Sequence, residues 1–115
     1  MLSIILASKS KVREEILKKN GINCTVVPSN IDEDPIKKNL LKNGASPEII
    51  SKNLAEEKAC IVSKNTNGKI VLGADSVIDL DGKIVSKPKN REKAFEILKN
   101  LNGKSHYLIS SVCIC

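Results

Sequence analysis

Short aliphatic runs alternate with segments of helical period along most of this chain, and that alternation restricts its fold more than any other feature. Buried strands are predicted at Leu2–Ala7, Ile22–Val27 and Lys69–Ala74, where aliphatic and β-branched residues are concentrated. Strands that alternate with helices form a sheet with helices packed on its faces. Since 115 residues suffice for one core, we expect a single α/β domain spanning residues 1–115.

Four helices are predicted from the signals at their ends. A capping residue directly before proline is typical of a helix start, and this pair occurs at Asp34-Pro35 and Ser46-Pro47. Asn20-Gly21 and Asn102-Gly103 are typical of helix ends. The predicted helices are Lys11–Asn20, residues 34 to about 43, residues 47 to about 64, and residues 90 to 102.

Asp81-Gly82 is the strongest hairpin signal, because this pair suits a tight two-residue turn. It joins predicted strands at Ser76–Leu80 and Lys83–Ser86. The last predicted strand, Ser105–Cys115, is apolar at its far end, which a continuation of the chain or a partner subunit of a homodimer would cover. The expected fold class is therefore α/β, with a mixed twisted sheet flanked by helices and a β-hairpin.

The net charge of +6 suits a polyanionic ligand, although the lysines are interspersed with Glu and Asn and a solvated surface is the simpler explanation. Phe95 and Tyr107 are the only aromatic residues, which argues against the stacking platforms of nucleic-acid binders. No apolar run approaches the ~20 residues of a membrane span, and no secretory signal is recognisable. We expect a cytoplasmic protein without membrane or nucleic-acid partners, whose four cysteines are reduced and partly buried.

The first strand leads directly into Ser8-Lys9-Ser10 and a helix, and such a junction favours an anion at the helix start. Taken alone this signal is weak, and Ser10 as no more than a helix N-cap is the simpler explanation. Arg13 falls on the apolar stripe of its helix, where it either pairs with a carboxylate at the core edge or reaches into a cleft to bind phosphate.

Lys58 lies within the apolar stripe of the third predicted helix, so an anion must lie near it. A structural ion pair and a substrate contact are equally consistent with this pattern. Glu33 lies in the acidic loop of residues 29–34, and Asp75 is predicted at the end of a buried strand, where ligands of α/β sheets bind. Two such carboxylates facing several cations would suit Mg²⁺ and a triphosphate. Pro88 holds Lys87 extended.

These segments, in this order, resemble the Maf family over essentially the whole chain. The matching segments are Leu6-Ala7-Ser8-Lys9-Ser10 with Arg13, Ile31-Asp32-Glu33, Leu54-Ala55 with Lys58-Ala59, Gly73-Ala74-Asp75, Asp81-Gly82-Lys83, Lys87-Pro88, and Leu101-Asn102-Gly103 with His106. The family's opening signature carries a proline and two consecutive arginines, whereas this chain has Lys11, Val12 and Arg13. The resemblance implies an inosine triphosphate pyrophosphatase-like architecture whose C-terminal lobe this chain does not complete.

The resemblance also implies an activity, namely Mg²⁺- or Mn²⁺-dependent hydrolysis of a nucleoside triphosphate, including a modified one, to the monophosphate and pyrophosphate. On this basis the catalytic residues are Asp75, Glu33 and Lys58, with Asp75 as proton acceptor and Glu33 and Asp75 as metal ligands. The substrate-binding residues are Ser8, Arg13, Lys58, Lys87, Val12 and Ser76, of which Val12 and Ser76 match positions that select the base.

Two other functions are consistent with the sequence. A catalytically silent nucleotide-binding module, linked to cell division as the resemblance also suggests, would keep affinity for nucleotides without turnover. A basic nucleic-acid binder would lose affinity steeply with salt.

Overall fold

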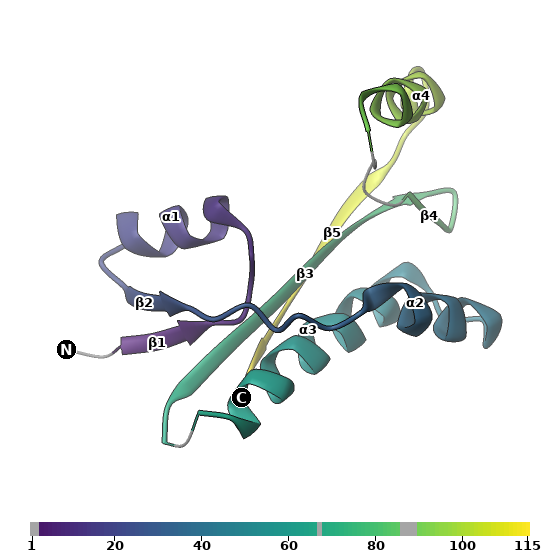
Figure 1. Cartoon of the computed structure of the whole chain (residues 1–115). Coiled ribbons are helices and arrows are strands. Elements are labelled where there is room, and N and C mark those ends of the chain that lie inside the picture. The colour runs from purple at the N-terminus through teal and green to yellow at the C-terminus, as the bar shows by residue number, and fades with distance from the viewer. Residues whose placement is uncertain (1–2, 67, 86–89) are drawn as a thin grey trace.

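A computed structural model of the chain describes residues 3–66, 68–85 and 90–115. The sheet runs through the middle of the molecule, α3 lies along it, and α4 lies at the far end beside the hairpin (Figure 1). In chain order the elements are β1 (Ser3–Leu6), α1 (Lys11–Lys19), β2 (Asn23–Val26), α2 (Glu33–Lys42), α3 (Pro47–Lys64), β3 (Ile70–Leu80), β4 (Lys83–Val85), α4 (Arg91–Leu101) and β5 (Tyr107–Ile114).

Each helix begins at a side chain that satisfies one of its free backbone N–H groups. Ser10, Asp32, Ser46 and Asn90 are the N-caps, and each accepts a hydrogen bond from a backbone N–H two or three residues later. An N-cap of this kind typically contributes about 1 kcal/mol. The prediction that Ser46-Pro47 opens a helix is confirmed, since Pro47 occupies the first turn of α3.

β3 is the centre of a mixed five-stranded sheet of order β2-β1-β3-β4, with β5 on the other edge of β3. β1 pairs in parallel with both β2 and β3, whereas β4 and β5 pair antiparallel to β3. β5 follows β3 continuously from Leu72 to Asp79. The predicted class, a mixed sheet flanked by helices with a hairpin, is confirmed.

The other edge of β3 is interrupted between its two partners. β1 pairs with it only as far as Leu72, whose carbonyl also accepts a hydrogen bond of 2.9 Å from the Ala7 N–H. β4 pairs with it only from Ile78 onward. Within the described residues no strand pairs with residues 73–77 along this edge, so carbonyl groups there are free to bind side chains.

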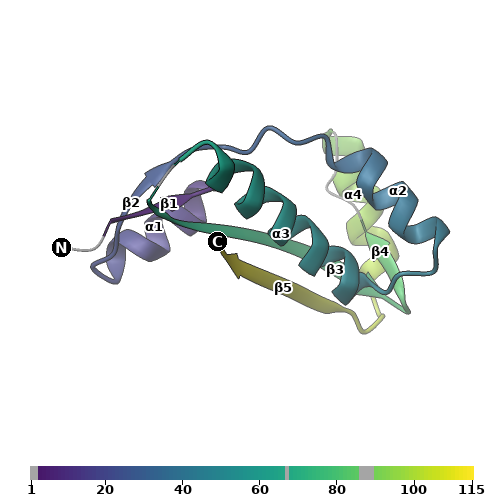
Figure 2. The same cartoon turned by 90° about the horizontal axis from the view of Figure 1, so that it is seen from below.

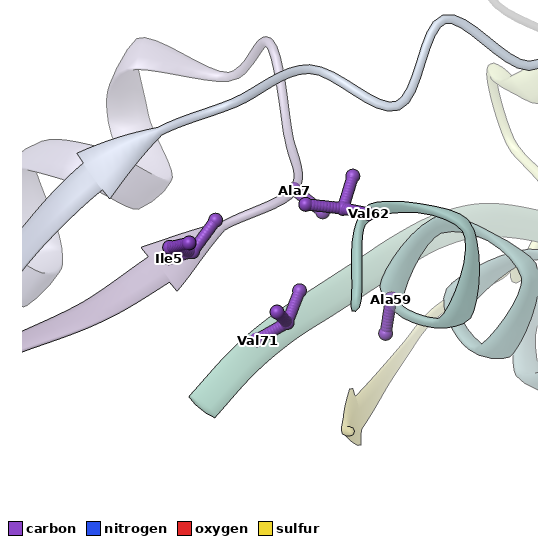
Figure 3. Packing of buried hydrophobic residues seen from close by; sticks show 5 residues of the cluster. All are labelled: Ile5, Ala7, Ala59, Val62 and Val71. Atoms are coloured by element: carbon purple, nitrogen blue, oxygen red, sulfur yellow. The ribbon is translucent and has the colours of Figure 1, made fainter. Parts of the chain in front are cut away.

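The core lies between α3 and the β1–β3 part of the sheet. Ile5, Ala7, Ala59, Val62 and Val71 form a buried cluster in which the strand residues face the helix residues (Figure 3). Seen from below, α3 runs along β3 with β5 beside them (Figure 2). This packing fixes which side of α3 faces the sheet, and therefore where Lys58 can reach.

Gly73 permits the close approach of α3 to β3. A Cβ atom built at this position would lie 2.7 Å from the Ala59 backbone nitrogen and 2.8 Å from the Ala59 Cβ. We expect Gly73→Ala to lower the free energy of unfolding by roughly 1–3 kcal/mol, because the helix must move away from the strand. Urea unfolding monitored by circular dichroism would measure this loss, and an unchanged midpoint would contradict the packing.

Two predicted element boundaries were wrong. The strands predicted at residues 69–74 and 76–80 form one strand, β3, because β5 hydrogen-bonds to it across the supposed break. Asp75 therefore lies in the middle of a strand and not at its end. Glu33 is the first residue of α2 and not part of a loop, because Asp32, two residues before the predicted Asp34, caps that helix.

The Asp81-Gly82 hairpin is confirmed. Both residues have positive φ, at 52° and 81°, as a tight two-residue turn between twisted strands requires. The Asp79 carboxylate accepts a hydrogen bond of 2.7 Å from the Gly82 N–H. Among the helices described, none is both long and apolar enough to cross a bilayer.

Candidate active site

A cavity of about 390 Å³ opens beside the interrupted edge of β3. It lies between the chain that leaves β1, the segment that leads into α2, and the middle of α3. Its polar lining includes both signs of charge, and its residues are Ala7, Ser8, Lys9, Ser10, Arg13, Ser29, Asn30, Ile31, Asp32, Glu33, Asp34 and Lys58. The predicted residues Ser8, Arg13, Glu33 and Lys58 thus come together from four separate segments.

Within the described part of the chain, the Arg13 guanidinium donates only to neutral acceptors. Its Nη1 donates to the Ser8 hydroxyl at 2.9 Å and to the Ala74 carbonyl at 3.2 Å, and its Nη2 donates to the Ser76 hydroxyl at 3.3 Å. The hydroxyl of Ser76 is in turn 2.8 Å from that of Ser110 on β5. These bonds orient the guanidinium without neutralising it, which leaves a fixed positive charge at the cavity.

Ser8 connects this charge to the start of α1. Its buried hydroxyl accepts hydrogen bonds from Arg13 Nη1 and, at 3.2 Å, from the Ser10 N–H. With both lone pairs engaged, its proton remains to be donated to an acceptor in the cavity. Ser10 is the N-cap of α1, as one of the two sequence interpretations held, and its hydroxyl accepts from the Arg13 N–H.

Lys58 lies between two carboxylates that come from different elements. Its Nζ is 2.6 Å from Glu33 Oε1 and 3.1 Å from Asp75 Oδ1, and its side chain is only 13% exposed. The ion pair, one of the two interpretations of Lys58 from the sequence, is therefore present. The same ammonium donates to the Ala74 carbonyl at 3.5 Å, so Lys58 and Arg13 share one acceptor on the open strand edge.

The two cations reach that acceptor from opposite faces of the sheet. Side chains alternate along β3, so Asp75 faces α3 and Lys58, while Ser76 faces the other way, toward Arg13. The carbonyl of Ala74 lies in the plane between them. The gap left by β1 and β4 is what makes this convergence possible.

Asp75 is buried behind Lys58 and does not line the cavity. The hydroxyl of Ser51, fully buried in α3, donates to the Asp75 carbonyl at 3.1 Å and holds the strand against the helix. Asp75 Oδ2 is buried and accepts no hydrogen bond from the described residues. A buried carboxylate oxygen without a partner is costly, so this atom needs a proton, a water or a cation.

Glu33 and Asp75 fit a divalent cation in part. Their oxygens converge on one point, where the Lys58 ammonium now lies, and they are the hard ligands that Mg²⁺ prefers. Among the described residues no group of three or more acidic, Cys or His side chains is placed to hold a metal. The protein would therefore supply two ligands, and water or phosphate oxygens would complete the set.

The remaining predicted residues are placed differently. Val12 is 63% exposed on α1 and does not line the cavity. The apolar stripe of α1, on which Arg13 was expected to lie, is therefore not buried. Ser76 lies beneath Arg13 and outside the cavity lining. Lys87 lies outside the described residues.

Three contributors were missed from the sequence. Ser110 binds Ser76 because β5 pairs with β3 in a register that no local pattern reveals. Asn30, with φ of 56°, turns the chain along the cavity wall. Ser51 gave a usable signal, since a serine between the buried Ile50 and Leu54 needs a hydrogen-bond partner.

Comparison with known proteins identifies the family. Residues 3–115 match the family model described as Maf-like protein. The chain belongs to this family. A Maf-like relative from Pelagibacter ubique, named nucleoside triphosphate pyrophosphatase, is 64% identical over 96% of this chain and 57% of its own length.

More distant Maf-like relatives carry more specific names. A protein of Brucella abortus named 7-methyl-GTP pyrophosphatase is 37% identical over 96% of this chain and 56% of its own length. One of Fusobacterium nucleatum named dTTP/UTP pyrophosphatase is 46% identical over 71% of this chain and 39% of its own length. The match thus covers between 39% and 57% of the length of these relatives.

Proposed function

We propose that this chain binds a nucleoside triphosphate with Mg²⁺ in the cavity and hydrolyses it to the nucleoside monophosphate and pyrophosphate. The observation that carries the proposal is the meeting of Arg13 and Lys58 at the Ala74 carbonyl, beside two carboxylates. A polyphosphate and a divalent cation together would satisfy all four groups. The names of the relatives support the reaction class.

The cations would act on the phosphate chain. Arg13 is already oriented by three acceptors and keeps donors free for phosphoryl oxygens. The Ser8 hydroxyl would donate a hydrogen bond to the same phosphate groups. Lys58 would exchange its carboxylate partners for a phosphate, so it gains a new anion as it leaves the old ones. Fixed positive charge such as that of Arg13 stabilises the transition state of phosphoryl transfer more than the ground state.

The departure of Lys58 would open its position between the two carboxylates to a metal cation. Glu33 and Asp75 would hold Mg²⁺ or Mn²⁺, which supplies charge neutralisation at the phosphoryl oxygens. Asp75 Oδ2, which is buried and lacks a partner among the described residues, would accept the proton of the attacking water. Base selection by Val12 and Ser76 would require the base to extend beyond the cavity, since neither residue lines it. Lys87 would add a further cation.

A panel of nucleoside triphosphates, including 7-methyl-GTP, dTTP and UTP, tests the reaction directly. We expect Mg²⁺-dependent pyrophosphate release from at least one of them. Mn²⁺ should replace Mg²⁺ in part, and EDTA should abolish the release. If the chain, shown to be folded by circular dichroism, releases pyrophosphate from none, the hydrolase assignment fails. The expected setting is the cytoplasm, with the chain alone or as a homodimer.

A catalytically silent nucleotide-binding module is the second candidate, and one observation favours it. Asp75 lies behind Lys58 and outside the cavity lining, so it reaches a substrate only if that ion pair opens. Affinity for a triphosphate by calorimetry, without pyrophosphate release by the same sample, would establish this alternative.

A further inference from the structure

Two thiols from elements distant in sequence meet at the end of the sheet. Cys60 of α3 and Cys115, directly after β5, have their Sγ atoms 3.2 Å apart and share a hydrogen bond. We propose that Cys60 and Cys115 are a redox modification site, which small disulfides oxidise to an intramolecular disulfide and small thiols reduce again. This site does not depend on the proposed nucleotide hydrolysis.

The backbone holds the two residues in place. The Cys115 N–H donates to the Val71 carbonyl at 2.8 Å, and its carbonyl accepts from the Val71 N–H at 3.0 Å, so Cys115 is anchored to the centre of the sheet. Cys60 follows Ala59, which packs on that same Val71 in the core. A disulfide requires sulfur atoms about 2 Å apart, so closure needs a movement of only ~1 Å.

Access for a small oxidant is present at both thiols. Cys115 is exposed and Cys60 is half-buried, and both remain unbridged in this structure. Cys24 lies on β2, away from the pair, and offers an internal comparison. Cys113, two residues before Cys115 on the same strand, packs partly against the core.

The chemistry balances with an ordinary low-molecular-weight disulfide such as glutathione disulfide. The exposed Cys115, as thiolate, attacks one sulfur of glutathione disulfide, which releases one glutathione and leaves a mixed disulfide. Cys60 then loses its proton, attacks the Cys115 sulfur and displaces the second glutathione. Two protein thiols are oxidised and one glutathione disulfide is reduced to two glutathione molecules.

The reaction should be faster in alkaline solution. The hydrogen bond with Cys115, followed by burial, raises the pKa of the Cys60 thiol, so its reactive thiolate is scarce at neutral pH. Burial also raises the pKa of the Cys113 thiol, which disfavours it as a competing nucleophile. Raising the pH toward the Cys60 pKa increases the thiolate and therefore the rate of closure.

The cross-link would tie α3 to the edge strand β5, which otherwise has one strand partner among the described residues. It closes a long loop between the two cysteines and so restricts the unfolded chain. We expect the oxidised protein to melt roughly 5–15 °C higher than the reduced protein.

The test is incubation of the folded chain with glutathione disulfide at alkaline pH, followed by mass spectrometry and peptide mapping under non-reducing conditions. The expected product has lost two hydrogens, keeps two of its four thiols and yields a Cys60–Cys115 linked peptide. Cys24→Ser and Cys113→Ser should form it as the natural sequence does. Cys60→Ser should stop at a glutathione adduct on Cys115, and Cys115→Ser should yield no linked peptide.

Other products would overturn the proposal. These are a stable glutathione adduct on Cys115 in the natural sequence, a disulfide that involves Cys113 or Cys24, or a covalent dimer. Cys60→Ser and Cys115→Ser each replace one sulfur by oxygen, so both variants should stay folded. Circular dichroism checks this. If the chain releases pyrophosphate from no triphosphate, the hydrolase proposal fails, but the formation of the Cys60–Cys115 disulfide is unaffected.

Discussion

Asp75→Asn is expected to reduce kcat for pyrophosphate release by about 10²- to 10⁴-fold, the usual contribution of a general base. The substitution keeps the size of the side chain and lets the amide oxygen accept from Lys58, so the ion pair becomes a hydrogen bond from the charged ammonium to a neutral acceptor. What it removes is the ability of Oδ2 to take a proton and to hold a cation. Initial rates with the preferred triphosphate at saturating Mg²⁺ measure the loss.

Asp81→Asn is the matched control for this substitution. Asp81 lies in the exposed hairpin turn, and Asn-Gly suits such a turn as well as Asp-Gly does. Its rates should equal those of the natural sequence. If Asp75→Asn retained full kcat, Asp75 would not be the proton acceptor and the reaction would need another base.

The second large effect concerns stability and is independent of any substrate. Lys58→Met should lower the free energy of unfolding by about 3–5 kcal/mol, because it leaves the buried Asp75 carboxylate without its counter-ion. The double variant Lys58→Met with Asp75→Asn removes that charge and should recover much of the loss. Guanidinium unfolding of the single and double variants gives the comparison.

Lys52→Met controls for the change in helix composition. Lys52 is exposed on the same helix, so this substitution should alter the unfolding free energy by no more than about 0.5 kcal/mol. A Lys58→Met protein as stable as Lys52→Met would mean that the carboxylate is solvated and the ion pair weak.

The sequence predicted helix starts and turns well where neighbouring residues alone determine them. Ser46-Pro47, Asp81-Gly82 and Asn90 act on their immediate neighbours, and the structure places each as predicted. The signal failed at Asp75, because pairing with β5, some 30 or more residues later, overrides the apparent strand end. Long-range pairing has no signature within a short window of sequence.

The candidate site was predictable to a similar extent. A cation within an apolar stripe requires an anion, and this requirement correctly placed an acidic partner at Lys58. For Arg13 the structure shows neutral acceptors instead of a carboxylate, which the sequence left open. The convergence at the Ala74 carbonyl depends on the gap between β1 and β4, and register of this kind could not be predicted.

The two arginines of the chain allow the most direct test of the cavity as a triphosphate site. Calorimetric titration with a non-hydrolysable α,β-methylene triphosphate and Mg²⁺ should show Arg13→Gln weaker than the natural sequence by on the order of 10- to 100-fold. Arg91→Gln, an equal loss of charge on the exposed start of α4, should bind as the natural sequence does. Equal weakening by both variants, or unchanged binding by Arg13→Gln, would contradict a triphosphate site at the open edge of β3.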